Sequence, residues 1–169
     1  MKFFSANLDS LRKLYIDQLQ QLYDAETQVT EALPKMIEAA TESGLKKALE
    51  THLQETTGHL ARVDEILIQA NGFVEPKRCK DIDALISEGE DVIKDATDES
   101  VRDAGIIAAA QKVEHYEIAA YGTLRTFAEI LGNEGHVVLL NQTLEEEKNA
   151  DAVLTRIADT ANNKARKVA

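Results

Sequence analysis

Glycine and proline are scarce in this sequence, with eight and two residues respectively among 169. Both residue types destabilise helix interiors, so their scarcity favours helices, and no strand-like alternation of any length appears. Aromatic residues are also few. A chain of this length can bury a continuous core, and we expect residues 1–169 to form a single domain.

Cysteine, long apolar runs and an excess of basic residues are also lacking. A single cysteine, Cys79, excludes an internal disulfide and a CxxC zinc motif. No uncharged stretch approaches the roughly 18 residues of a membrane span. The apolar run near the N-terminus is shorter than the core of a signal peptide. The net charge of −11 argues against nucleic acid, because a duplex repels an acidic surface. We therefore expect a cytoplasmic protein with neither nucleic-acid nor membrane partners.

Helical hydrophobic periodicity persists over four long segments, and a shorter fifth segment is amphipathic. The predicted helices cover about 7–41, 45–70, 82–96, 99–131 and 134–162. Glycine-containing pairs at 43–44, 71–72 and 132–133 are expected to end the first, second and fourth of these helices. Asp98 is the expected N-cap of the fourth.

The connections between these helices predict a topology. Short turns join the first helix to the second and the fourth to the fifth, so each pair should form an antiparallel hairpin. A long connection that contains the short helix joins the two hairpins. Two hairpins with one long crossover form the ferritin-like arrangement. We predict an all-α, ferritin-like four-helix bundle with one extra short helix.

Acidic residues or histidines interrupt the inward apolar seam of every long helix near its middle. In chain order they are Glu26, His52, Glu55, His59, Glu114, Glu117, Glu147 and Asp151. Heights along the bundle can be compared by counting residues back from each turn. Glu117 and Glu147 are equally far from Gly132, so they should meet inside their hairpin.

Carboxylates inside a bundle need a counterion, because desolvation costs each ion several kcal/mol. The seams supply no Lys or Arg, so two metal ions are the predicted counterions. Oxygen-rich sites with some imidazole and no thiolate suit iron or manganese.

Alternatives stay open for several of these residues. A seam assigned one position out of phase would leave a glutamate facing solvent, and His52 and His59 compete for one ligand role. Asp151 is a ligand, an outer hydrogen-bond acceptor or a rim charge. Tyr121 either bonds to a ligand carboxylate or only fills the core. Glu145 and Glu146 are expected to face solvent, although Glu146 borders the seam.

Several stretches carry a resemblance to a known family. They are AETQ (25–28), ALPK (32–35), HLQET (52–56), AAQKVEHYEIA (109–119) and EEK (146–148). The chain resembles the YciE/YciF family of ferritin-like bacterial stress proteins over nearly its whole length. The resemblance implies a homodimer with a dinuclear metal site and a role in stress. By matching positions it implies the metal ligands Glu26, His52, Glu55, Glu114, Glu117 and Glu147.

The pattern departs from the usual di-iron bundle, in which two helices carry Glu-x-x-His. The helix at 45–70 reads His52-x-x-Glu55 or Glu55-x-x-x-His59, and the last helix has no histidine near Glu147. Because of this departure, manganese stays a candidate metal as well as iron.

Two functions therefore stay open. One is a dimetal oxidoreductase that handles O2, peroxide or ferrous ion. The other is a structural or interaction protein whose site is empty. Metal content separates them.

Overall fold

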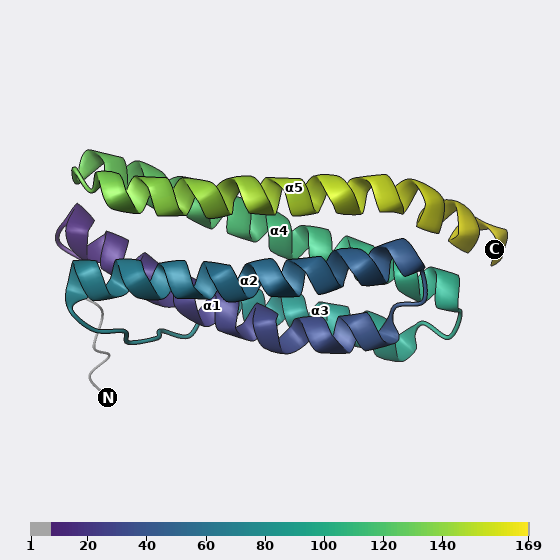
Figure 1. Ribbon diagram of the computed structural model, residues 1–169. Helices are drawn as coiled ribbons and strands as arrows, with labels where there is room; N and C mark the ends of the chain where they lie inside the picture. The colour runs from purple at the N-terminus through teal and green to yellow at the C-terminus, as the bar shows by residue number, and fades with distance from the viewer. Residues whose placement is uncertain (1–7, 169) are drawn as a thin grey trace, which may run out of the picture.

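The computed structural model describes residues 8–168, and helices account for most of this part of the chain (Figure 1). They are α1 (Leu11–Ala39), α2 (Ser43–Asn71), α3 (Lys80–Asp95), α4 (Glu99–Ile130), α5 (Glu134–Ala165) and the short 3-10 helix η1 (Arg166–Val168). No strand occurs between residues 8 and 168, so the predicted all-α class is confirmed. That residues 1–169 form one domain stays a prediction.

The four long helices form two antiparallel hairpins, α1–α2 and α4–α5 (Figure 1). The crossover and α3 carry the chain back along the bundle, from the end at which α2 finishes to the end at which α4 begins. This return makes α2 and α4 run parallel. α3 packs against α1 and α4 on the outside of the bundle. The predicted ferritin-like topology with one extra helix is confirmed.

Helix ends follow local capping chemistry. Gly72 and Gly132 take left-handed φ values of 82° and 73° directly after α2 and beside the end of α4, as their positions predict. Asp98 caps α4, because its side chain accepts hydrogen bonds from the backbone N–H of Ser100 and Val101 at 2.8 and 3.0 Å. α1 begins at Leu11, and position 7 of the predicted helix lies outside the described residues.

The turn between α1 and α2 lies earlier than predicted. α1 ends at Ala39, and the pair at 43–44 begins α2 instead of ending the first helix. Glu42 explains the shift, since its carboxylate accepts the backbone N–H of Leu45 at 2.7 Å and caps α2. The buried carboxylate of Asp103 in α4 accepts the backbone N–H groups of Thr41 and Glu42, both at 2.8 Å. The turn is therefore fixed by a residue far away in the sequence.

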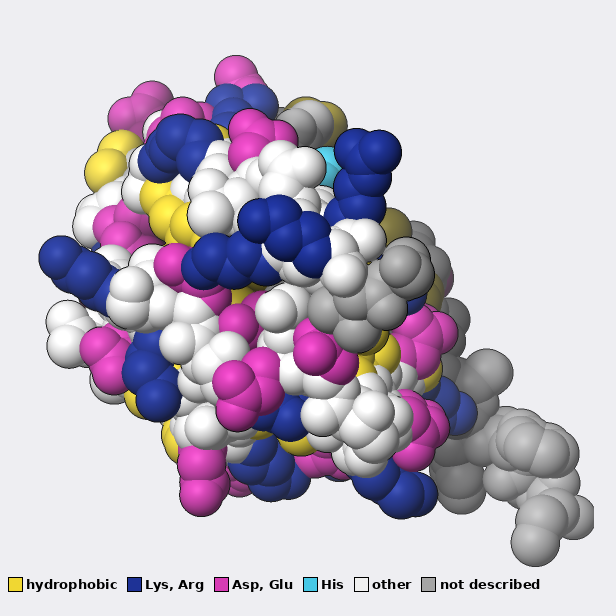
Figure 2. Space-filling view, turned by 90° about the vertical axis from the view of Figure 1, so that its right-hand side faces the viewer, with side chains coloured by type: hydrophobic (Ala, Val, Ile, Leu, Met, Phe, Trp, Pro, Cys, Tyr) yellow, Lys and Arg dark blue, Asp and Glu magenta, His cyan; other side chains and the backbone are white. Residues whose placement is uncertain are grey.

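The exterior of the bundle carries charges of both signs. Figure 2 looks along the bundle onto the end that holds the α1–α2 turn, and acidic and basic side chains are interspersed there. None of the helices within residues 8–168 combines the length and apolarity that crossing a membrane requires.

Candidate metal centre

The middle of the bundle interior is polar, although apolar layers lie on either side of it. Six potential metal ligands from the four long helices are at most 5% exposed there: Glu26, His52, His59, Glu114, Glu117 and Glu147. All six lie among the predicted candidates. Charged groups at this depth require pairing or metal coordination.

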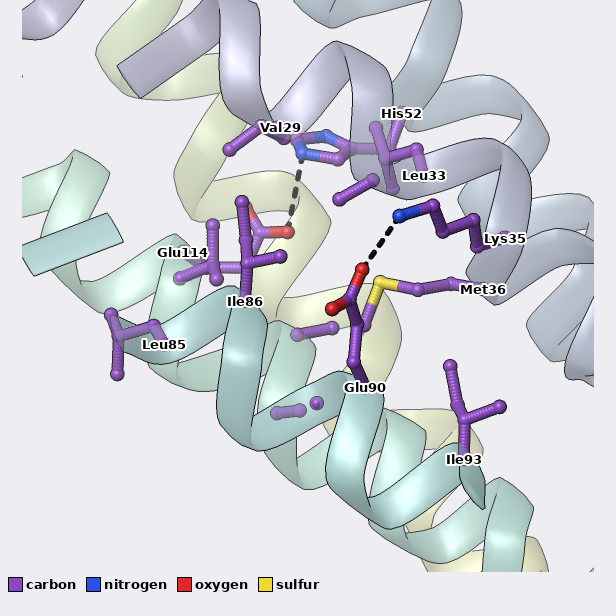
Figure 3. Close-up of a pocket in the computed structure, with 15 residues that line it drawn as sticks. Val29, Leu33, Lys35, Met36, His52, Leu85, Ile86, Glu90, Ile93 and Glu114 are labelled. Carbon is purple, nitrogen blue, oxygen red and sulfur yellow. Dashed lines mark hydrogen bonds and ion pairs between the residues drawn. The ribbon is translucent and has the colours of Figure 1, made fainter. Parts of the chain in front are cut away.

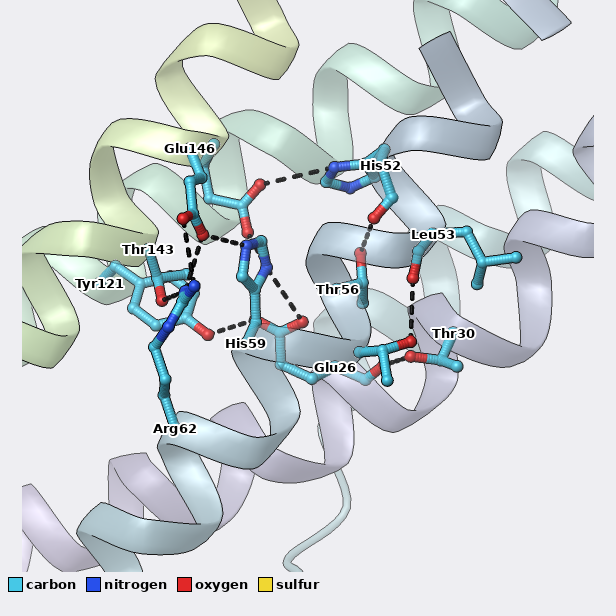
Figure 4. Close-up of polar contacts among 12 residues, drawn as sticks. Glu26, Thr30, His52, Leu53, Thr56, His59, Arg62, Tyr121, Thr143 and Glu146 are labelled. Atoms are coloured by element: carbon cyan, nitrogen blue, oxygen red, sulfur yellow. Dashed lines mark hydrogen bonds and ion pairs between the residues drawn. The ribbon is translucent and has the colours of Figure 1, made fainter. Parts of the chain in front are cut away.

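A first group of ligand atoms combines α1, α2 and α5. One atom each from Glu26, His59 and Glu147 lie within 4.8 Å of one another. His59 Nδ1 is 2.8 Å from Glu147 Oε1 and 3.7 Å from Glu26 Oε2. Figure 4 shows His59 beside Glu26 in this part of the interior.

A second group combines α2, α4 and α5. It consists of His52, Glu114, Glu117 and Glu147, again with one atom of each within 4.8 Å of the others. His52 Nε2 is 3.4 Å from Glu114 Oε1, and His52 Nδ1 is 4.0 Å from Glu147 Oε2. The two groups share Glu147, which turns Oε1 toward His59 and Oε2 toward His52. A carboxylate placed in this way is suited to bridge two cations.

Unsatisfied polar atoms concentrate in these two groups. Ten buried side-chain nitrogen and oxygen atoms within residues 8–168 lack a hydrogen bond of good geometry, and nine of them belong to the six candidate ligands. Buried polar atoms are normally hydrogen-bonded. The residues present therefore fit a pair of metal ions, which would coordinate these atoms.

Burial and crowding change the protonation of the acids. Burial raises the pKa of Glu114 and Glu117 well above the ordinary value of 4.5, and the charge of Glu147 raises both further. Burial also raises the pKa of Glu26. Burial acts in the same direction on Glu147, but its contacts with His59 and His52 outweigh it and lower the pKa. Three acids thus hold their protons more tightly than in water, and metal binding would displace protons from them.

The two histidines differ in protonation. Burial lowers the pKa of His52, which favours the neutral imidazole that a metal requires. Burial alone would lower the pKa of His59 as well, but its contacts with Glu147 and Glu26 raise it to about 10. In the metal-free protein His59 is therefore a cation paired with Glu147, and it must release a proton before its Nδ1 can bind a metal.

Residues outside the two groups hold His59 and Glu26 in place (Figure 4). Glu146, expected to face solvent at the border of the seam, is half-buried, and its Oε2 lies 3.0 Å from His59 Nε2. Arg62 donates two hydrogen bonds to Glu146, at 2.7 and 3.1 Å. Tyr121 donates a hydrogen bond to Glu26. This outcome selects the first of the two roles predicted for Tyr121. Partners of this kind orient metal ligands.

Sequence reasoning missed Arg62. Its signal was spacing, since Arg62 follows His59 by three residues and therefore lies on the same side of α2. Arg62 also donates to Thr143 Oγ1 at 2.7 Å, and Thr143 precedes Glu146 by three residues on α5. Polar residues of α2 and α5 therefore bond to one another at the edge of the apolar seam.

Glu55 and Asp151 belong to neither group. Glu55 is only half-buried, and the next residue, Thr56, is fully buried and takes the inward position predicted for Glu55. Asp151 is also half-buried, accepts a hydrogen bond from Gln111 at 3.1 Å and lies 3.5 Å from the exposed His115. Metal ligation by Glu55 or Asp151 stays a prediction.

The arrangement explains the departure from Glu-x-x-His on two helices. In the observed phase, α2 reads Thr56-x-x-His59 and α5 reads Glu147-x-x-Ala150, so one glutamate and one histidine of the usual set are replaced. His52, one turn before Thr56, points at Glu114 and Glu147 and supplies the second imidazole. Each group therefore contains one histidine, so the two imidazoles occupy different places; that either is a ligand stays a prediction.

Known proteins are similar to this chain in sequence and in fold. Residues 10–167 match the family described as Domain of unknown function (DUF892). Protein YciF of Escherichia coli (strain K12) is 43% identical over 159 residues, which cover 94% of this chain and 96% of that protein. The crystal structure of the E. coli stress protein YciF superposes with a TM-score of 0.87 at 42% identity, over 92% of this chain and 98% of that one. YcfI from Rhodopseudomonas palustris, for which a structural role has been suggested, superposes with a TM-score of 0.87 at 42% identity, over 90% of this chain and 98% of that one.

Proposed function

The chain belongs to the DUF892 family and is related to the E. coli stress protein YciF, and from this premise we propose that it binds two iron or manganese ions and reacts with a small oxidant. The relationship confirms the resemblance to the YciE/YciF family. One observation carries the proposal: two groups of buried ligand atoms share Glu147, and each group contains one histidine. An acidic cluster that served only to fill the core would have no reason to be divided in this way.

Charge balance supports two divalent ions. The cluster contains the carboxylates of Glu26, Glu114, Glu117 and Glu147 and two imidazoles. Four carboxylates with a total charge of −4 match two divalent cations with a total charge of +4. Oxygen-rich ligand sets with imidazole and without thiolate favour iron or manganese. The charge of the two cations would also offset the desolvation cost of ionising the four buried acids.

The residues of the cluster and their neighbours would have different roles in this function. The metal ions, when bound, supply the chemistry that binds and reduces the oxidant, which is O2 or peroxide, or that oxidises ferrous ion. Glu147 would hold the two ions at a fixed separation, while Glu146 and Arg62 fix the ring of His59. A cavity of about 220 Å³ between α2 and α5 reaches His52 and Glu114 and passes Glu55. This cavity would give small molecules a route to the cluster.

A second function is favoured by a different observation. A structural role has been suggested for YcfI, which superposes over most of the chain. In that case the cluster would hold no metal, and the protein would act as a helical interaction module under stress. We place either form in the cytoplasm as a homodimer, the oligomeric state that the family resemblance implies.

Metal content tests the proposal. Purified protein would be loaded anaerobically with Fe(II) or Mn(II), desalted and analysed by mass spectrometry for metal per chain. We expect two ions per chain in the wild type and a loss of metal in Glu147→Gln. Glu145→Gln is the matched control, because Glu145 is exposed and pairs with Lys148 on the surface. If the wild type retains no metal, the metal-binding proposal is overturned and the structural function remains.

A further inference from the structure

A small pocket adjoins the candidate metal centre on the side away from the cavity between α2 and α5. It has a volume of about 30 Å³ and lies between α1, α3 and α4, with His52 of α2 at its inner end (Figure 3). By the same measure a single water needs about 10–15 Å³, so the pocket accommodates a molecule of a few atoms. The helix α3, which is extra to the four-helix bundle, forms one of its walls.

The walls of this pocket are almost entirely apolar. Four of the fifteen lining residues are titratable, and they form two pairs at its borders. His52 and Glu114 lie at the buried border, and the exposed ion pair Lys35–Glu90, with 2.6 Å between Nζ and Oε1, lies at the other. Figure 3 shows Leu33 beside His52, Ile86 beside Glu114 and Met36 beside Glu90.

The lining selects the kind of molecule that the pocket takes. A water in its centre would lack the two to four polar partners that stabilise buried water. An ion or a peroxide molecule would lose hydrogen bonds on entry for the same reason. A small apolar molecule loses none. The cavity between α2 and α5 is larger, at about 220 Å³, and Lys47, Glu55 and Asn149 are among the residues that line it.

Gly89 of α3 lines the pocket at a point where α3 lies close to α1 and α4. A Cβ atom at this position would lie 3.3 Å from the Cβ of Ala109 and 3.6 Å from the Cε of Met36. Both neighbours line the pocket. A methyl group at position 89 would therefore occupy the space between α3 and the helices that face it.

We propose that the pocket between α1, α3 and α4 is a binding site for dioxygen, from which the gas reaches the His52–Glu114 side of the cluster. The inference rests on the proposed function, and it identifies O2 as an oxidant of this centre. Two routes then serve one cluster. Dioxygen arrives through the small apolar pocket, and peroxide arrives through the larger cavity between α2 and α5.

Xenon, an apolar gas, tests the site without metal or turnover. Crystals of the metal-free protein would be pressurised with xenon, and the anomalous signal would locate bound atoms. We expect a xenon site in the pocket of the wild type, its loss in Gly89→Ala, and higher occupancy in Ile86→Ala, which enlarges the pocket. Gly122→Ala is the matched control, because a Cβ there meets nothing within 4 Å and lies outside the pocket.

Oxygen uptake by the Fe(II)-loaded protein forms the second arm of the test. Gly89→Ala should slow O2 consumption several-fold, while the consumption of peroxide and the metal content stay at wild-type values. An empty pocket in the wild type under xenon, or equal xenon occupancy in Gly89→Ala, would overturn the inference. If the protein binds xenon as predicted but retains no metal, the proposed function is overturned and the gas site remains.

Discussion

The rings of His52 and His59 lie 6.2 Å apart, centroid to centroid, and each faces a different oxygen of Glu147. Both rings come from α2, two turns apart. One helix therefore supplies the only imidazoles among the described ligand groups. The proposed centre is asymmetric as a result, since α4 and α5 contribute oxygen alone.

Single histidine variants should separate the two metal positions. We expect His52→Ala to retain the ion held by Glu26, His59 and Glu147, and His59→Ala to retain the ion held with Glu114 and Glu117. Each variant should then carry half of the metal of the wild type, measured per chain after anaerobic loading. Full metal content in both variants would show that neither imidazole is a ligand.

Removal of Arg62 should weaken metal binding without touching a ligand. Arg62→Met deletes both hydrogen bonds to Glu146 and leaves His59 Nε2 beside a carboxylate that is free to turn. Loss of such an orienting partner lowers metal affinity by about 10- to 100-fold. Titration with Mn(II) by calorimetry would measure it. Lys148→Met, which breaks a surface ion pair instead, should bind as the wild type does.

The stability of the metal-free protein should fall as the pH rises, because of Glu117. Burial raises the folded-state pKa of Glu117 well above the unfolded value of 4.5. The folded state therefore binds this proton more tightly, which stabilises the protein below the unfolded pKa. That contribution is lost as the pH rises from 4.5 through the raised folded pKa.

Glu117→Gln removes this dependence, because the amide does not ionise. In chelator, urea unfolding should show a gain in the free energy of unfolding over the wild type at about pH 8 that is larger than at about pH 5. Glu145→Gln, at an exposed position, should follow the wild type at both values. The same difference between wild type and Glu117→Gln at both values would contradict the assignment of a raised pKa.

Gly105 should be essential for the contact between α3 and α4. A Cβ atom at this position would lie 2.2 Å from Val92 Cγ1 on α3, so an alanine must displace the Val92 side chain or push the two helices apart. Overpacking of this kind costs about 1–3 kcal/mol, and we expect Gly105→Ala to lower the free energy of unfolding by that amount. Gly122→Ala, with open space around it, should be neutral or stabilising in the same thermal or urea melts. Equal stability of the two variants would contradict the close packing of α3.

The helices and their order could be predicted from the sequence because their signals are local. The apolar period extends over many turns in each long helix, and Gly72 and Gly132 mark the ends of α2 and α4. The turn between α1 and α2 could not be placed in this way. Its position depends on Asp103, which is some sixty residues away and binds the N–H groups of Thr41 and Glu42.

The ambiguity at Glu55 has a geometric cause. His52 and His59 are seven residues apart, and a seam between them passes equally well through position 55 or position 56, as steps of three and four or of four and three. The sequence alone does not distinguish these steps, and the packing of α2 against its neighbours selects Thr56. Glu146 was assigned to solvent for a similar reason, since its partner Arg62 lies on another helix.

Because both imidazoles are carried by α2, they move as one rigid unit. A small slide of this helix along its axis would displace the two rings together relative to Glu147, so it would change both proposed metal positions at once. Variation of the turn at 40–42, directly before α2, would therefore act on both ions of the proposed pair.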